Sequence, residues 1–199
     1  RLRRLDASWF FKRLADKPLP WQSIEIMLAD ERWVPVDHPD SNEGQLRALL
    51  PEQISDRFLS LRGEGEDALA QAALVNKRLV NHPLFDVATL GMGTDGHTVS
   101  LFPDAPQFSR GLDTTNPNAC LVVDPPQAAH QRISMSLGRL LRSQQIIVHV
   151  TGAQKAEMLC EAWQAMIRTG FPSPRYCTSS ALRSVFSATT TFLLPTNSP

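Results

Sequence analysis

The chain has 199 residues and a mass of 22.1 kDa, a size that fits one domain with a substantial hydrophobic core. Hydrophobic residues make up 42% and charged residues 20%, which excludes a disordered or fibrous chain. The 20 Lys and Arg residues balance the 20 Asp and Glu residues, so no net charge attracts nucleic acid or an anionic membrane.

We expect no membrane-spanning segment and no signal peptide in this sequence. No apolar run approaches the roughly 20 residues that span a bilayer, and the first residues, RLRRLD, lack a signal-peptide core, so we expect a cytoplasmic protein. The three cysteines, Cys120, Cys160 and Cys177, are an odd number without metal-ligand spacing. We therefore expect no disulfide framework and no metal site.

The first fifty residues are expected to form a helix, a strand and a second helix. Apolar residues at helical spacing predict a helix within 1–16, which the prolines at 18 and 20 end. Alternation over 23–29 predicts a strand that ends in Asp-Glu-Arg at 30–32. Ser41 or Asn42 is a suitable cap for a helix that runs to residue 50.

The rest of the chain alternates helices with strands. Asp67 is a suitable cap for a helix over 68–80, and a strand over 85–90 leads into a glycine loop at 91–98. We then expect, in order, a helical turn at 99–102, a surface loop at 104–118, strands at 120–123 and 132–135, a helix at 137–142, a strand at 145–150 and a helix at 152–167.

This alternation predicts an α/β fold with a mainly parallel sheet flanked by helices. Such sheets bind ligands beyond the carboxyl ends of their strands. Three of the predicted strands end in chemically useful residues, namely Asp30-Glu31-Arg32, the glycine loop and Thr151-Gly152. We therefore expect the functional site where these three segments converge.

The glycine loop matches the spacing of a dinucleotide-binding motif, but its surroundings do not. Gly91, Gly93 and Gly96 follow a predicted strand, as that motif requires. However, Pro103 prevents the full helix that must follow, and Asp113, the acidic residue at the right distance, lies in a polar loop. The sequence therefore does not indicate nicotinamide or flavin binding.

The same loop carries groups suited to acid–base chemistry. Asp95 lies two positions from His97, and a free imidazole has a pKa of about 6.5, so it can accept a proton near neutral pH. Asp95 is well placed to orient or polarise the imidazole, while the glycines allow a substrate to approach the backbone. The spacing alone favours a solvated loop histidine over a catalytic one.

Four segments together resemble the 6-phosphogluconolactonase family, the lactonase branch of the glucosamine/galactosamine-6-phosphate isomerase superfamily. The resemblance covers about residues 9–168 and rests on its motifs, their order and their spacing. The motifs are LADERWVP at 28–35 with DSN at 40–42, LGMGTDGHTVSLFP at 90–103, RISM at 132–135 and TGAQKA at 151–156.

The resemblance implies a single domain over 1–199 with a three-layer fold of modified Rossmann type, and hydrolysis of 6-phosphoglucono-1,5-lactone in the pentose phosphate pathway. It implies no metal and no organic cofactor. His97 matches the general base, Asp95 its acidic companion and Lys155 a lysine that faces the substrate phosphate. We assign oxyanion stabilisation to Arg32 and loop N–H groups. The remaining residues expected to bind substrate are Asp30, Ser41, Asn42, Gly91, Gly93 and Gly96.

Both ends of the chain depart from the family pattern. Residues 1–8 contain no counterpart of the family's first strand and its Ser-Gly-Gly-Ser-Thr-Pro-like phosphate loop, and residues 169–199 lack the expected last strand and helix. The sheet is thus expected to lack its first strand. A non-catalytic sugar-phosphate-binding protein, disabled by the missing loop, is therefore one alternative.

The second alternative is a glucosamine-6-phosphate deaminase, because that related branch shares the fold and the Asp-Gly-His loop. Its loop continues toward Phe-Asn-Glu-Pro, whereas Ser-Leu-Phe-Pro stands here at 100–103 without the glutamate. We expect a small sugar-phosphate lactone as the substrate, no nucleic-acid or membrane partner, and a monomer or weak dimer.

Overall fold

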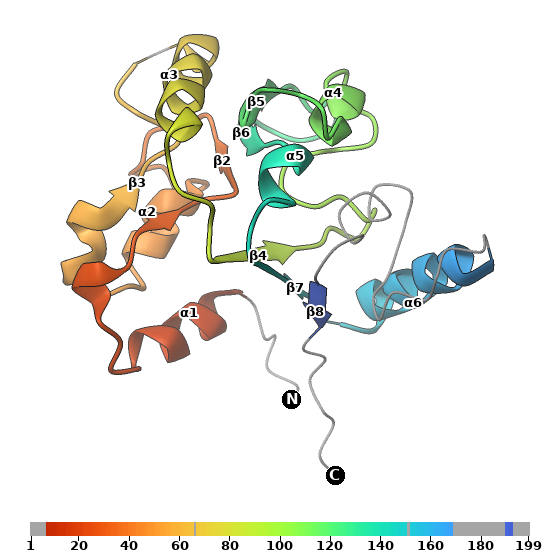
Figure 1. Ribbon diagram of the computed structural model, residues 1–199, viewed down its shortest axis with the longest axis horizontal. Helices are drawn as coiled ribbons and strands as arrows, with labels where there is room; N and C mark the ends of the chain where they lie inside the picture. The colour runs from red at the N-terminus through yellow and green to blue at the C-terminus, as the bar shows by residue number, and fades with distance from the viewer. Residues whose placement is uncertain (1–6, 66, 151, 169–189, 193–199) are drawn as a thin grey trace.

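The computed structural model describes residues 7–65, 67–150, 152–168 and 190–192 (Figure 1). In these ranges helices and strands alternate along most of the chain. The elements are α1 (Ala7–Ala15), β1 (Ile26–Met27), β2 (Asp30–Arg32), α2 (Asn42–Arg47), β3 (Phe58–Leu59), α3 (Ala68–Val80), β4 (Val87–Gly91), α4 (Phe108–Leu112), β5 (Cys120–Val123), β6 (Arg132–Met135), α5 (Leu137–Leu140), β7 (Gln145–His149), α6 (Ala153–Arg168) and β8 (Thr190–Phe192), with 3-10 helices at Trp21–Ser23 and Glu52–Arg57.

A parallel sheet of order β4-β7-β8 stands at the centre of the view in Figure 1. Its register aligns Gly91 at the end of β4 with His149 at the end of β7. Leu90 and Val148, which are also register partners, are 2% and 1% exposed. Because both strands run in the same direction, the glycine loop after β4 and the start of α6 after β7 emerge at the same edge of the sheet.

A second sheet, of order β2-β6-β5, is antiparallel. Helix α3 packs against β5 and β6, and its buried face, which includes Val75 and Leu79, joins the main hydrophobic core. Ile133 and Met135 of β6 are each 1% exposed and belong to the same core. Burial on this scale stabilises the sheet by roughly 1.5–3 kcal/mol per large apolar side chain.

The predicted α/β class with parallel strand pairing is confirmed, with one correction to the sheet. Residues 30–32 were predicted at the carboxyl end of the strand over 23–29. They form a separate strand instead, β2, which pairs with β6 in antiparallel register. The predicted strand over 23–29 contributes only β1, which pairs with β3 in a separate parallel sheet. The strands therefore form three small sheets, one of them antiparallel, among the described residues.

Both predicted helix caps are confirmed. The side chain of Asp67 accepts a hydrogen bond from the N–H of Leu69 at the start of α3, and Ser41 accepts one from Gly44 at the start of α2. The helical turn expected at 99–102 is wrong, because Val99 has a φ of +50° and residues 98–101 form only a turn. The loop expected at 104–118 contains α4.

The predictions for the two ends fall mainly outside the described residues. They concern the missing first strand and phosphate loop at residues 1–8 and the departure from the family pattern at residues 169–199. Residues 7 and 8 are described and lie in α1. Residues 190–192 are described and form β8, which pairs in parallel with β7. In the described ranges, no helix has both the length and the apolar character needed to cross a bilayer.

Candidate active site

The loop that follows β4 is closed by its own backbone. The N–H of Gly93 donates to the carbonyl of His97 at 2.8 Å, and the N–H of Gly96 donates to the carbonyl of Gly93 at 3.3 Å. Gly96 has a φ of +85°, a left-handed conformation that costs a residue with a Cβ free energy. The glycines therefore fold residues 93–97 into a tight turn that presents two reactive side chains.

Those two side chains are Asp95 and His97, which are joined by a hydrogen bond. Nδ1 of His97 lies 2.6 Å from Oδ1 of Asp95, and the His97 ring also contacts the ring of Phe102, with 4.1 Å between centroids. When Nδ1–H donates to the carboxylate, Nε2 carries the lone pair that can accept a proton. The contact between Asp95 and His97 that the sequence predicted is therefore present, and their roles as base and orienting carboxylate stay predictions.

The carboxylate of Asp95 is held in its charged form. Partial burial by itself raises the pKa of Asp95, but the hydrogen bond and the charge of His97 outweigh it and lower this pKa below its usual value. The side chains of His97 and Asp95 are 23% and 52% exposed, so solvent and substrate reach the pair. Asp95 therefore stays negative at neutral pH.

Gly93 leaves the space that the His97 ring occupies. A Cβ added at Gly93 would overlap the His97 ring atoms Cε1 and Nδ1 and the Asp95 oxygen Oδ1. Gly91, by contrast, has no heavy atom within 4 Å of an added Cβ. Of the two, only Gly93 is thus required for the position of the imidazole.

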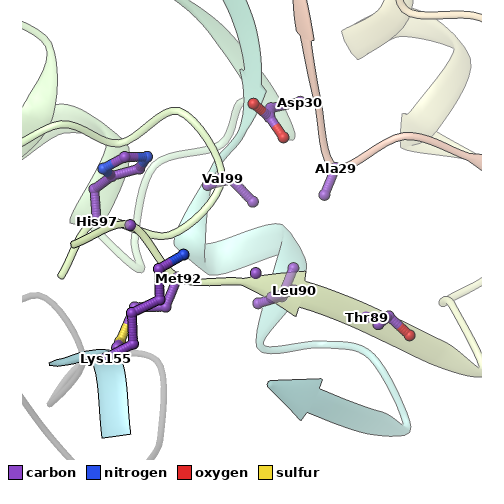
Figure 2. A pocket seen from close by; sticks show the side chains of 10 residues that line it. Ala29, Asp30, Thr89, Leu90, Met92, His97, Val99 and Lys155 are labelled. Carbon is purple, nitrogen blue, oxygen red and sulfur yellow. The ribbon is translucent and has the colours of Figure 1, made fainter. Parts of the chain in front are cut away.

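His97 faces a cavity of about 310 Å³ at the edge of the central sheet (Figure 2). In Figure 2 Lys155 and Met92 lie on one side of the cavity, and Asp30 and Ala29 lie on the other. The full lining is Ala29, Asp30, Thr89, Leu90, Gly91, Met92, Gly93, His97, Val99 and Lys155. Five predicted site residues, Asp30, Gly91, Gly93, His97 and Lys155, therefore line one cavity.

Lys155 reaches the cavity from the start of α6. The chain enters this helix through Gly152, whose φ of +92° turns it from the edge of the sheet into the helix. Within the described part of the chain, the ammonium group of Lys155 forms no ion pair. A free cation at a helix N-terminus favours the binding of an anionic group such as a phosphate.

Asp30 is the acidic residue of the cavity wall. Its Oδ2 accepts a hydrogen bond of 2.6 Å from the hydroxyl of Ser100, which is 1% exposed. The N–H of Ser100 in turn donates to the hydroxyl of Ser134 on β6. Sequence reasoning missed Ser100, although it follows the Asp-Gly-His motif by three positions, because nothing local shows that it contacts residue 30.

Five predicted site residues do not line the cavity: Asp95, Arg32, Ser41, Asn42 and Gly96. Asp95 contacts His97 instead, and Gly96 is buried in the turn. Ser41 is 1% exposed, and its hydroxyl donates to the carboxylate of Glu31, which also accepts the N–H of Asn42. Arg32 donates through Nη1 to the carbonyl of Asp40 at 2.6 Å. Asn42 supports the cavity wall from behind, because its side-chain amide donates to the carbonyl of Asp30 at 3.1 Å.

The chain is similar to known sugar-phosphate enzymes over most of its length. The family described as glucosamine-6-phosphate isomerases/6-phosphogluconolactonase matches residues 7–181. A 6-phosphogluconolactonase of Pseudomonas putida is 42% identical over 75% of this chain and 63% of its own length. One from Neisseria meningitidis serogroup A is 36% identical over 78% of this chain and 69% of its own length.

This chain is also similar in structure to solved proteins of the same fold. A 6-phosphogluconolactonase from Shewanella baltica superimposes with a TM-score of 0.73 at 33% identity, covering 92% of this chain and 76% of that one. A monomeric glucosamine-6-phosphate deaminase superimposes with a TM-score of 0.67 at 20% identity, which shows a shared fold alone. In the sequence comparison, the segment matched to the Pseudomonas putida relative covers 63% of that protein, somewhat less than two thirds of its length.

Proposed function

The chain belongs to the family of glucosamine-6-phosphate isomerases and 6-phosphogluconolactonases, and on that basis we propose that it hydrolyses 6-phosphoglucono-1,5-lactone to 6-phosphogluconate. The observation that carries the proposal is the hydrogen-bonded pair of His97 and Asp95 at a cavity that Lys155 and Asp30 also line. Relatives at 36–42% identity bear the name 6-phosphogluconolactonase.

His97 is the general base of the proposed reaction. Its Nε2 takes a proton from a water molecule as the water oxygen attacks the carbonyl carbon of the lactone. The bond between this carbon and the ring oxygen then breaks, and the proton on His97 passes to the ring oxygen, which leaves as a hydroxyl group. Asp95 remains ionised and stabilises the imidazolium between these two steps, as in other carboxylate–histidine pairs.

Two cations are assigned to the charges of the substrate. Lys155 binds the phosphate, because its ammonium group lies at the cavity without an ion-pair partner among the described residues. Arg32 is assigned to the oxyanion, as the sequence predicted; in this structure its guanidinium donates to the carbonyl of Asp40 and does not line the cavity, so this role requires the side chain to turn toward the substrate. The N–H of Gly93 is excluded as an oxyanion donor, since it donates to His97.

The other proposed substrate contacts divide into direct and supporting ones. Asp30, Gly91 and Gly93 line the cavity and contact the substrate, while Gly96 shapes the turn. Ser41 and Asn42 act through strand β2, because Ser41 donates to the carboxylate of Glu31 and Asn42 donates to the carbonyl of Asp30. A single domain, a cytoplasmic location and a monomeric or weakly dimeric state complete the proposal.

The test is hydrolysis of freshly generated 6-phosphogluconolactone by the 199-residue chain, corrected for the spontaneous reaction. The proposal predicts turnover in the wild type that His97→Ala abolishes. Binding of 6-phosphogluconate without turnover would instead establish the non-catalytic alternative. Release of ammonia from glucosamine 6-phosphate would establish the deaminase alternative.

A further inference from the structure

Two histidines and an aspartate meet outside the cavity, at the loop that follows β2. One side-chain ligand atom from each of His38, Asp40 and His130 lies within 4.8 Å of the other two. Nε2 of His130 is 2.9 Å from Oδ2 of Asp40, and the rings of His38 and His130 meet edge to face with 5.3 Å between centroids. His130 lies ninety positions from Asp40, so the fold alone creates this cluster.

The backbone under each of these residues is anchored. Arg32 donates to the carbonyl of Asp40, and Arg132 donates through Nη1 to the carbonyl of His130 at 3.0 Å. The N–H of His38 donates to the carbonyl of Pro35. Hydrogen bonds therefore hold the backbone at all three positions. Two of these bonds come from arginine side chains on β2 and β6.

His130 has a left-handed backbone conformation, which is uncommon for residues other than glycine. Its φ is +67°, in the left-handed region, where a side chain other than glycine costs free energy. This conformation turns the imidazole toward Asp40, with which it forms the hydrogen bond. Strained residues of this kind concentrate at sites with a function, because selection must maintain them against their cost.

We propose that His38, Asp40 and His130 bind a divalent transition-metal ion of the Zn²⁺ type. Two imidazoles and one carboxylate form a ligand set that zinc accepts, whereas Mg²⁺ and Ca²⁺ prefer sites made of oxygen atoms. Three protein ligands leave a fourth position of a tetrahedral ion for water. None of the three residues lines the cavity or has a role in the proposed hydrolysis, although Asp40 accepts a hydrogen bond from Arg32 through its backbone carbonyl.

The geometry needs only a small contraction to hold the ion. Ligand atoms about 2.0–2.1 Å from a tetrahedral metal lie about 3.3 Å from one another. Nε2 of His130 and Oδ2 of Asp40 lie 2.9 Å apart, and the ligand atoms of all three residues lie within 4.8 Å of one another, so side-chain rotations bring them to this spacing. Because all three side chains are partly or fully exposed, such rotations do not disturb the core.

Charge and protonation at the cluster also fit a cation. An aspartate carboxylate is ionised at neutral pH, so Asp40 is available as a ligand. Nε2 of His130 binds the metal in the tautomer whose proton is on Nδ1. The nearby Arg32 and Arg132 oppose a dication, and the negative charge of Asp40 offsets part of that repulsion.

The test measures Zn²⁺ binding by the chelator-treated chain in competition with a chromophoric chelator. The proposal predicts one equivalent of bound Zn²⁺, a rise in melting temperature when Zn²⁺ is added, and no displacement of Zn²⁺ by excess Mg²⁺. His38→Gln, Asp40→Asn and His130→Asn should each weaken binding by at least about tenfold. Asn is chosen at position 130 because it tolerates a positive φ.

Two control variants separate this cluster from other histidines. His82→Gln removes a second histidine–carboxylate contact, between Nε2 of His82 and Glu25, and should leave Zn²⁺ binding unchanged. His97→Ala removes the imidazole of the proposed active site and should also leave it unchanged. No stoichiometric binding by the wild type would overturn the proposal, as would binding that depends on His97 or survives all three cluster variants.

Discussion

Two adjacent acidic residues of β2 have opposite surroundings. The carboxylate of Glu31 is 2% exposed and accepts hydrogen bonds from the backbone N–H groups of residues 32, 42 and 43 and from the hydroxyl of Ser41. The carboxylate of Asp30 lies at the cavity and accepts one hydrogen bond, from Ser100. Because side chains alternate across a strand, neighbours in one motif can face a substrate and a helix end respectively.

The same contrast separates two larger regions. The glycine loop after β4 presents Asp95 and His97, partly exposed and bonded mainly to each other. The region around Glu31 and α2 contains Ser41 and Glu43, each buried and saturated with hydrogen bonds. We infer that changes in the glycine loop alter the reaction and that changes around Glu31 alter stability.

After His97→Ala, the largest expected effect on the reaction comes from Gly93→Ala. The added Cβ displaces the His97 imidazole, so we expect a loss of hydrolysis on the order of 10²–10⁴, as for removal of a general base. Steady-state kinetics measure this loss. Gly65→Ala is the matched control, since no heavy atom lies within 4 Å of a Cβ there. Equal activity of the two variants would show that the position of His97 does not depend on Gly93.

On the stability side, Ser41→Ala tests the region around Glu31. The hydroxyl caps α2 and also donates to Glu31, so we expect the free energy of unfolding to fall by about 1–2 kcal/mol. Asp67→Ala removes an exposed cap of α3 and should cost less, about 0.5–1 kcal/mol. Urea denaturation measures both, and a larger loss for Asp67→Ala would reverse the expected ranking.

Local patterns predicted the local parts of this structure. Helix α3 and strands β5 and β6 match their predicted bounds, and the contact between Asp95 and His97 spans only two positions. The antiparallel pairing of β2 with β6 joins residues about a hundred positions apart, and no local pattern specifies it. For the same reason the contacts of Ser100 with Asp30 and of His130 with Asp40 could not be predicted from spacing.

The smallest expected effect is the pH dependence that Asp95 adds to stability. The pKa of Asp95 in the folded chain lies below its ordinary value of 3.8, so its stabilising effect is complete above that pH and is lost as pH falls through the lowered pKa. The difference in unfolding free energy between wild type and Asp95→Asn should therefore be constant near neutral pH and shrink below pH 3.8. A difference that grows on acidification would contradict this sign.

The most direct test of the contrast is to compare Asp30→Asn with Glu31→Gln for both lactone hydrolysis and urea unfolding. We expect Asp30→Asn to lower kcat/KM by about 10–100-fold while the free energy of unfolding changes little, since the amide oxygen still accepts from Ser100. Glu31→Gln should lower that free energy by about 3 kcal/mol or more, because its amide group faces buried N–H donors. Full activity of Asp30→Asn, or a Glu31→Gln variant as stable as the wild type, would contradict the account.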